Sequence, residues 1–204
     1  MENLSIISKL RKIAKPLPEE EIEKCSFCGR RLPDDHRHLV DLSVMKFMCT
    51  CEMCMITMPA KGNYKPLPQR YLRLDDFNLP DELWADFLIP VNMAFFVMST
   101  SRQGTVAYYP APTGATESKL KMEPWEELKL LNPILNDLSP DLEALLVNRL
   151  EDSNQYFIVP VDSCYKLIGM IRMAWKGIFG GTEVNNVIRN FFKELNEKSV
   201  KCPI

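Results

Sequence analysis

Five of the seven cysteines in this 204-residue chain lie in one short stretch, and their spacing is that of a metal site. The stretch holds two Cys-x-x-Cys pairs and one further thiol: Cys25 with Cys28, Cys51 with Cys54, and Cys49. Each pair can fold back so that two thiolates face one ion. Four thiolates favour tetrahedral zinc, so residues 25–54 predict a small zinc ribbon.

The fifth thiol leaves the ligand set open. We expect the symmetric set of Cys25, Cys28, Cys51 and Cys54 to bind the ion, with Cys49 as the alternative to Cys51. Zinc is therefore the expected cofactor. Iron is the alternative, because the same all-thiolate geometry also holds iron in electron carriers.

His36 and His38 are the only histidines of the chain, and both lie between the two cysteine pairs. With enough thiolates for one ion, we expect them at a strand edge or around the ligands rather than on the metal. A site closed by four cysteines has no open position for substrate, which disfavours metal-dependent hydrolysis.

The elements that must position these cysteines follow from the surrounding sequence. Residues 38–42 and 44–48 read as two short strands around a turn near Ser43. The predicted organisation is an amphipathic helix, the metal module, a proline-rich connector and an α+β domain: 1–20, 21–58, 59–79 and 80–204.

The last of these segments predicts two hairpins and four helices. The expected strands are 91–100 with 105–111, and 141–150 with 155–161, with a helix as the alternative for 141–150. The expected helices are 81–88, 123–131, 163–176 and 183–198, with Asp81, Asp162 and Thr182 as caps. Hairpin pairs without regular β–α alternation favour an antiparallel sheet with helices packed on one face, so the fold class is α+β.

Other groups in residues 80–204 carry weaker signals. The 108–118 segment is expected as a long loop before a helix, either an ordered connector or a cradle for an anion or a partner's tail. Gly180 and Gly181 predict a tight turn, with a generic anion site as the alternative. Cys164 is expected to be buried, because no histidine is left in this region to activate it, and Cys202 to be exposed. An enzyme is therefore disfavoured.

The charge and hydropathy of the chain disfavour several classes of function. The net charge of −2 gives no general attraction to nucleic acid or membranes, although residues 21–73 hold nine basic and six acidic side chains. The longest apolar runs, such as 88–98, are too short for a membrane span, and the first residues do not resemble a signal peptide. We expect a cytoplasmic protein with reduced thiols.

Several strings together resemble one uncharacterised family: CSFCGRRLPDDHRHLVDL, CTCEMC, LDDFNLPDELWADFLIPVNMAFF, YYPAPTGATES, VPVDSCYKLIGMIR and GGTEV. The resemblance runs from about residue 25 to 195. Members of that family are bacterial and archaeal proteins often encoded beside nickel–iron hydrogenase genes. The resemblance implies a role in hydrogenase assembly, iron–sulfur delivery or electron supply. Its matching positions are the five clustered cysteines, both histidines, the 110–118 segment and the start of the helix at 162–172.

The leading hypothesis is a zinc-binding, non-enzymatic accessory protein whose partner is a hydrogenase subunit or maturation factor. A rubredoxin-like electron carrier with iron in the four-cysteine site is the alternative. A nucleic-acid-binding regulator that uses the mildly basic metal module is weaker, because few aromatic residues accompany the charge.

Overall fold

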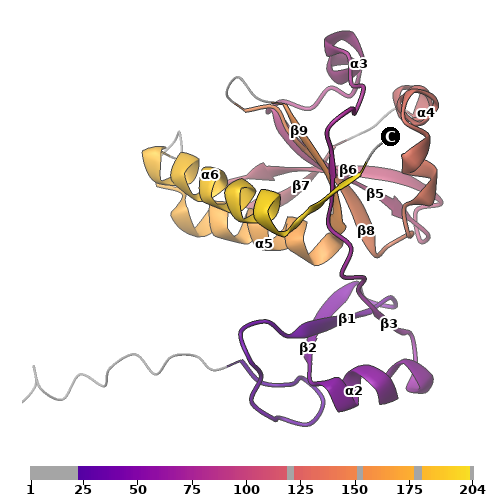
Figure 1. Ribbon diagram of the computed structural model, residues 1–204, viewed down its shortest axis with the longest axis vertical. Helices are drawn as coiled ribbons and strands as arrows, with labels where there is room; N and C mark the ends of the chain where they lie inside the picture. Colours follow the sequence, from indigo (N-terminus) through magenta and orange to yellow (C-terminus); the bar gives the residue numbers. More distant parts are fainter. Residues whose placement is uncertain (1–22, 119–121, 151–153, 177–180, 203–204) are drawn as a thin grey trace, which may run out of the picture. The chain divides into compact units, whose positions relative to one another are not determined.

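The computed structural model describes residues 23–118, 122–150, 154–176 and 181–202. The helix expected at 1–20 lies outside these residues. The chain divides into two compact units, on either side of the bond between Pro66 and Leu67. Each unit is described by itself below, with the element labels of Figure 1.

The first unit is a three-stranded sheet with a short helix between its second and third strands in sequence. Its elements are β1 (Arg37–Asp41), β2 (Lys46–Thr50), α2 (Glu52–Thr57), the 3-10 turn η1 (Pro59–Lys61) and β3 (Tyr64–Pro66). The strand order is β2-β1-β3, and both pairings are antiparallel. The predicted hairpin around Ser43 is confirmed, whereas β3 comes from the segment expected as a connector.

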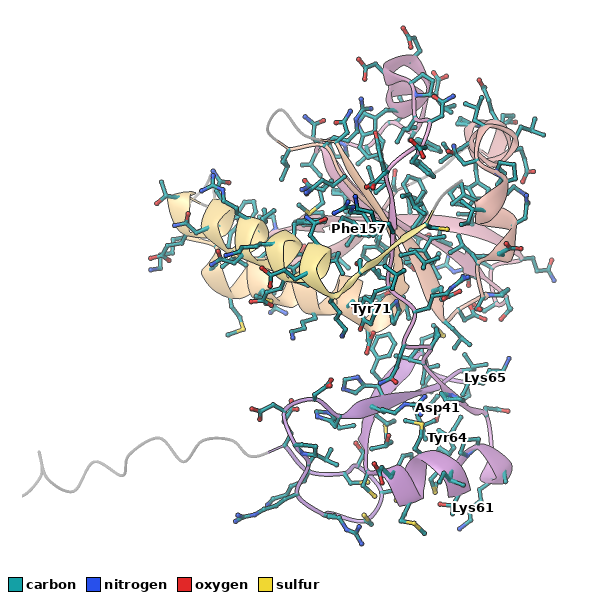
Figure 2. The ribbon with its side chains drawn as sticks, in the orientation of Figure 1. Asp41, Lys61, Tyr64, Lys65, Tyr71 and Phe157 are labelled. Carbon is teal, nitrogen blue, oxygen red and sulfur yellow. The ribbon has the colours of Figure 1, made fainter. Side chains whose placement is uncertain are left out.

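Local chemistry closes the β1–β2 hairpin. The Asp41 carboxylate accepts hydrogen bonds from the backbone N–H of Ser43 at 2.9 Å and from its hydroxyl at 2.6 Å. An aspartate that bonds two residues ahead in this way holds a turn without help from the core. Tyr64 of β3 stands edge-on to Phe27, with ring centroids 5.3 Å apart, and its neighbours Lys61 and Lys65 are exposed (Figure 2).

The second unit contains a seven-stranded sheet of order β10-β4-β9-β8-β5-β6-β7. Its strands are β4 (Leu72–Leu74), β5 (Met93–Ser99), β6 (Gly104–Ala111), β7 (Gly114–Ser118), β8 (Glu143–Asn148), β9 (Gln155–Pro160) and β10 (Val200–Cys202). All neighbours are antiparallel except β10, which runs parallel to β4. The two predicted hairpins are confirmed as β5–β6 and β8–β9.

The described residues of this unit also form four helices and one 3-10 segment: α3 (Asp81–Asp86), α4 (Met122–Leu131), η2 (Pro133–Asp137), α5 (Val161–Ala174) and α6 (Gly181–Lys198). The predicted caps Asp81 and Asp162 are wrong, by one and two positions. Pro80 and Pro160 occupy the N-cap positions, so the two aspartates lie in the first turn. A carboxylate there still favours the positive end of the helix dipole.

Helices cover both faces of the second sheet. Successive residues of a strand point to opposite faces, and Phe95 and Phe96 of β5 show where each face leads. Phe95 meets Tyr165 of α5, whereas Phe96 stacks on Trp125 of α4 with centroids 5.4 Å apart. The α+β class is confirmed, but the helices lie on two faces rather than the expected one (Figure 1).

Helix α6 packs through one apolar stripe. Its buried side chains are Val184, Ile188, Phe191, Phe192 and Leu195. Phe192 reaches Phe157 of β9, with ring centroids 5.9 Å apart; Phe157 is labelled in Figure 2. At the end of the helix, the Lys198 ammonium lies 3.8 Å from the centre of the Tyr71 ring. These contacts fix α6 against the part of the sheet that contains β9 and β4.

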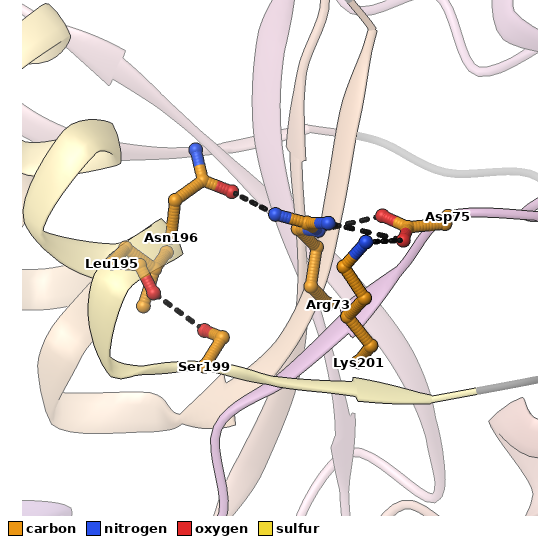
Figure 3. A network of polar contacts seen from close by, with 6 residues as sticks. All are labelled: Arg73, Asp75, Leu195, Asn196, Ser199 and Lys201. Atoms are coloured by element: carbon orange, nitrogen blue, oxygen red, sulfur yellow. Dashed lines mark hydrogen bonds and ion pairs between the residues drawn. The ribbon is translucent and has the colours of Figure 1, made fainter.

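The pairing of β4 with β10 carries a polar cluster (Figure 3). Arg73 donates to both carboxylate oxygens of Asp75, at 2.6 and 3.1 Å, and Lys201 lies 3.5 Å from the same carboxylate. Arg73 also reaches the side chain of Asn196 on α6 at 3.5 Å. The strand β4, like β3, comes from the segment expected as a connector.

Candidate metal centre

The first cysteine pair is held by a tight backbone turn. The N–H of Gly29 donates to the carbonyl of Cys25 at 2.9 Å, and the N–H of Cys25 donates to the carbonyl of Arg30 at 2.8 Å. Gly29 has a φ of 71°, in the left-handed region that favours glycine. The turn therefore directs the side chains of Cys25 and Cys28 to the same side.

The second pair opens a helix. Cys51 is the N-cap residue of α2, Cys54 lies in its first turn, and the N–H of Met55 donates to the carbonyl of Cys51 at 2.9 Å. The module thus differs from the expected ribbon of two similar turns. The side chains of an N-cap residue and of a residue in the first helical turn can point toward one ion, as those of two cysteines in a tight turn do. The Cys-x-x-Cys spacing therefore suits both arrangements.

The four sulfur atoms of these two cysteine pairs lie close together. The Sγ atoms of Cys25, Cys28, Cys51 and Cys54 all lie within 4.8 Å of one another. Those of Cys28 and Cys51 are 3.7 Å apart. A tetrahedral zinc ion with Zn–S bonds of about 2.3 Å requires S–S separations of about 3.8 Å. The sulfur atoms can therefore hold one metal ion with little movement.

The thiols of this cluster differ in acidity. Burial opposes ionisation of Cys25, but backbone hydrogen bonds from Cys51, Phe27 and Cys28 outweigh it and lower its pKa to about 6. Burial and the other three sulfurs raise the pKa of Cys54 to about 12. Crowded thiolates repel one another, so a bound cation is what allows all four to ionise together.

Cys49 lies outside this set. It is directly opposite His38 in the β1–β2 pairing, and its Sγ forms a second group with ring nitrogens of His36 and His38, again within 4.8 Å of one another. Burial and the nearby Glu23 carboxylate raise the pKa of Cys49. The register of the two strands, which sequence spacing alone did not reveal, brings this group together.

The other candidate residues of the second unit agree with their predictions to different degrees. Residues 108–118, expected as a loop before a helix, instead form most of the β6–β7 hairpin, with the turn at 112–113. Cys164 is completely buried, as expected, and burial raises the pKa of its thiol well above the ordinary value. Cys202 is half-buried against the core rather than exposed.

The glycine pair before α6 is described only in part. Gly180 lies outside the described residues, and Gly181 is the first residue of the helix. Thr182, the predicted cap, therefore lies inside the first turn.

A pocket that no sequence motif marked lies beside α6, with a volume of about 460 Å³. Its lining combines apolar Leu150, Ile188 and Phe192 with amide and charged side chains, among them Asn148, Gln155, Arg189 and Lys193. The Asn148 side chain donates to that of Gln155 at 3.0 Å. These residues come from β8, β9 and α6, so their grouping depends on the fold.

Comparison with known proteins identifies the family. Residues 24–199 match the model described as "Family of unknown function (DUF5947)". The chain belongs to this family. The DUF5947 match spans both units and includes the five clustered cysteines and both histidines. No curated protein and no solved structure matches the chain.

None of the helices in the described part of the chain is both long enough and apolar enough to cross a bilayer. The longest of them, α6, alternates its apolar stripe with charged and amide residues.

Proposed function

We propose that Cys25, Cys28, Cys51 and Cys54 bind one structural zinc ion, and that the protein is a non-enzymatic accessory protein. The observation that supports this most directly is the convergence of four Sγ atoms within 4.8 Å. The 3.7 Å separation of the Cys28 and Cys51 sulfurs agrees with the edge of a zinc–thiolate tetrahedron.

A structural role agrees with the small core around the site. The buried members of that cluster are Cys25, Leu32 and Cys51, and partly buried Phe27 packs against them. Beyond this cluster the unit also buries Leu39, Val40 and Met55, but a module this small usually needs a metal or disulfides as well as its apolar core. Zinc ligation can contribute on the order of 10 kcal/mol to such a module.

A binding role agrees with the distribution of reactive groups. Both histidines of the chain lie in the metal module, and Cys164 of the second unit is buried with a raised pKa. The α2 helix, which begins at the metal site, exposes Met53 and Ile56 at 59% and 74%. Residues three apart share one helix face, so the ion would hold an apolar face ready for a protein partner.

The resemblance to proteins encoded beside nickel–iron hydrogenase genes supplies the proposed partner, a hydrogenase subunit or maturation factor. Pull-down from native cells, followed by mass spectrometry, tests this choice. We expect Met53→Glu/Ile56→Glu to lose the partner while keeping its zinc. The matched control is Leu130→Glu/Met173→Glu, which changes two residues of the second unit that are 82% and 86% exposed. Loss of the partner in both variants, or in neither, would contradict this docking face.

Metal analysis after anaerobic purification tests the ion itself. We expect stoichiometric zinc bound by sulfur and no visible colour. Ferric iron in the same four thiolates absorbs strongly in the visible, so a coloured protein containing iron would replace the proposal with the electron-transfer alternative. Protein without either metal, even after reconstitution with zinc, would overturn both.

A further inference from the structure

The register of the β1–β2 hairpin brings three potential metal ligands onto one face. His38 and Cys49 are direct partners in the antiparallel ladder, so their side chains project to the same side. His36 precedes His38 by two residues, and alternation along an extended chain returns to the same face after two. The two imidazole rings are 4.8 Å apart, and one nitrogen from each lies within 4.8 Å of the other and of the Cys49 sulfur.

The contacts of the His36 ring are those that usually orient a metal-bound histidine. Its side chain is only 5% exposed, and its Nδ1 lies 2.9 Å from the carbonyl oxygen of Pro33 and 3.3 Å from the Glu23 carboxylate. Both neighbours are acceptors, so in the neutral ring the proton belongs on Nδ1 and Nε2 keeps its lone pair. An outer hydrogen bond from the ring to a carbonyl or carboxylate is the usual support of a metal-bound imidazole.

The Nε2 atom of His36 is buried and has no hydrogen-bond partner within the described part of the chain. Buried polar atoms are almost always paired, because burial removes the water that would otherwise satisfy them. Contacts to Nδ1 on the opposite side of the ring hold the Nε2 lone pair in place. A buried lone pair that is held in this way without a partner indicates that an electron-pair acceptor binds there. A metal ion at this position would satisfy it.

We propose that His36, His38 and Cys49 bind a second metal ion, separate from the ion of the four-cysteine site. Imidazole and thiolate together favour zinc among the common divalent ions, with cobalt(II) as its spectroscopic substitute. Three protein ligands leave the fourth tetrahedral position for water or an exogenous ligand, unlike a site closed by four cysteines. The two sites of one small module would thus differ in kind, one closed and one open.

The experiment uses the full chain with the four-cysteine site loaded. Zinc is titrated into the protein, bound ions are counted, and X-ray absorption reports the ligand atoms. We expect two ions per chain and imidazole nitrogen in the coordination sphere. Because the chain has only two histidines, any imidazole signal must come from His36 or His38.

Variants separate the two sites. Cys49→Ser and His36→Gln/His38→Gln should each reduce the count from two ions to one, and the double histidine variant should leave sulfur-only coordination. Cys202→Ser, a thiol in β10 of the second unit, is the matched control and should keep both ions.

Wild-type protein that binds one ion through sulfur alone would overturn this inference and leave the four-cysteine proposal standing. One ion with mixed sulfur and imidazole ligands would overturn both. If the variants do not fold, proton NMR of the cobalt-loaded wild type decides the matter. We expect a strongly shifted exchangeable N–H from His36, and its absence with two equivalents of cobalt would contradict the site.

Discussion

Arg70 holds the buried carboxylate of Glu143 through two parallel hydrogen bonds, Nε to Oε1 and Nη2 to Oε2, both 2.7 Å long. The Glu143 side chain is only 1% exposed, and the backbone N–H of Ser139 also donates to it at 3.0 Å. This pair ties the segment before β4 to the start of β8. The Glu143 carboxylate raises the pKa of Arg70 further above its usual range.

Replacing Arg70 with Met should destabilise the second unit, because it leaves a buried carboxylate without its cation. Removal of one partner from a buried pair costs about 3–5 kcal/mol. Arg70 itself is 36% exposed, so solvent reduces the expected loss to about 2–3 kcal/mol. Urea unfolding measures it. The control Arg102→Met breaks the exposed pair with Glu117 and should cost under about 1 kcal/mol. Equal losses in the two variants would contradict the role given to burial.

A second prediction concerns Asn132, another buried polar residue. This fully buried side chain accepts from the N–H of Asn78 at 2.8 Å and donates to the carbonyls of Asn78 and Leu128, at 2.7 and 3.0 Å. Asn132→Asp keeps the shape but turns a carboxylate toward two carbonyl oxygens.

We expect Asn132→Asp to cost about 3 kcal/mol at neutral pH, since it buries an unpaired charge. Acid should narrow the deficit, because a protonated carboxyl can donate one of the lost hydrogen bonds. Asn136→Asp, at an exposed site one turn away, should change stability little. Thermal unfolding of both variants near pH 5 and pH 8 provides the comparison, and a deficit that grows in acid would contradict the assignment.

Alkaline pH should weaken the second unit through Tyr165. Burial, with the neighbouring Tyr108 and Cys164, raises its pKa from 10 to about 12. A raised pKa means that the folded state keeps a proton that the unfolded state releases. The contribution is fully present below pH 10 and is lost as the pH rises toward 12. Tyr165→Phe should flatten the fall in stability over this window. The same slope in variant and wild type would show that Tyr165 is not its source.

Removal of the metal should affect one unit and spare the other. We expect a strong chelator to abolish amide protection in the β1–β2 hairpin, whose small core depends on ligation. Protection of β8 and β9 should persist, because their core consists of side chains from residues 67–204. Hydrogen exchange with mass spectrometry resolves the two regions. Full protection of β1 and β2 after verified metal loss would contradict a structural role for the ion.

Local signals predicted most of the elements near the site. Two Cys-x-x-Cys pairs marked the cluster, and the alternation of apolar residues marked the hairpins β1–β2, β5–β6 and β8–β9. The apolar spacing of α6 likewise predicted its buried stripe. These features depend on residues close together in sequence, where geometry follows from the period of the chain.

Features that depend on the exact register of two strands, or on pairing between distant segments, could not be predicted in the same way. The short strands β3, β4 and β10 have no alternation long enough to recognise, and their proline and charged residues resemble a linker. The grouping of Cys49 with both histidines needed the register of β1 against β2, which the spacing of residues along one strand does not determine.

Strand β4 also has a consequence for the order in which the second unit assembles. Although it comes first among the strands of its sheet in the sequence, it lies between β9 and β10, with Leu72 opposite both Ile158 and Val200. Closing such long loops costs more entropy than forming a hairpin, so contacts between distant segments form slowly. The hairpins β5–β6 and β8–β9 should therefore nucleate folding, and the insertion of β4 should be among the last steps. Until then the edge of β9 remains open to pairing with another chain.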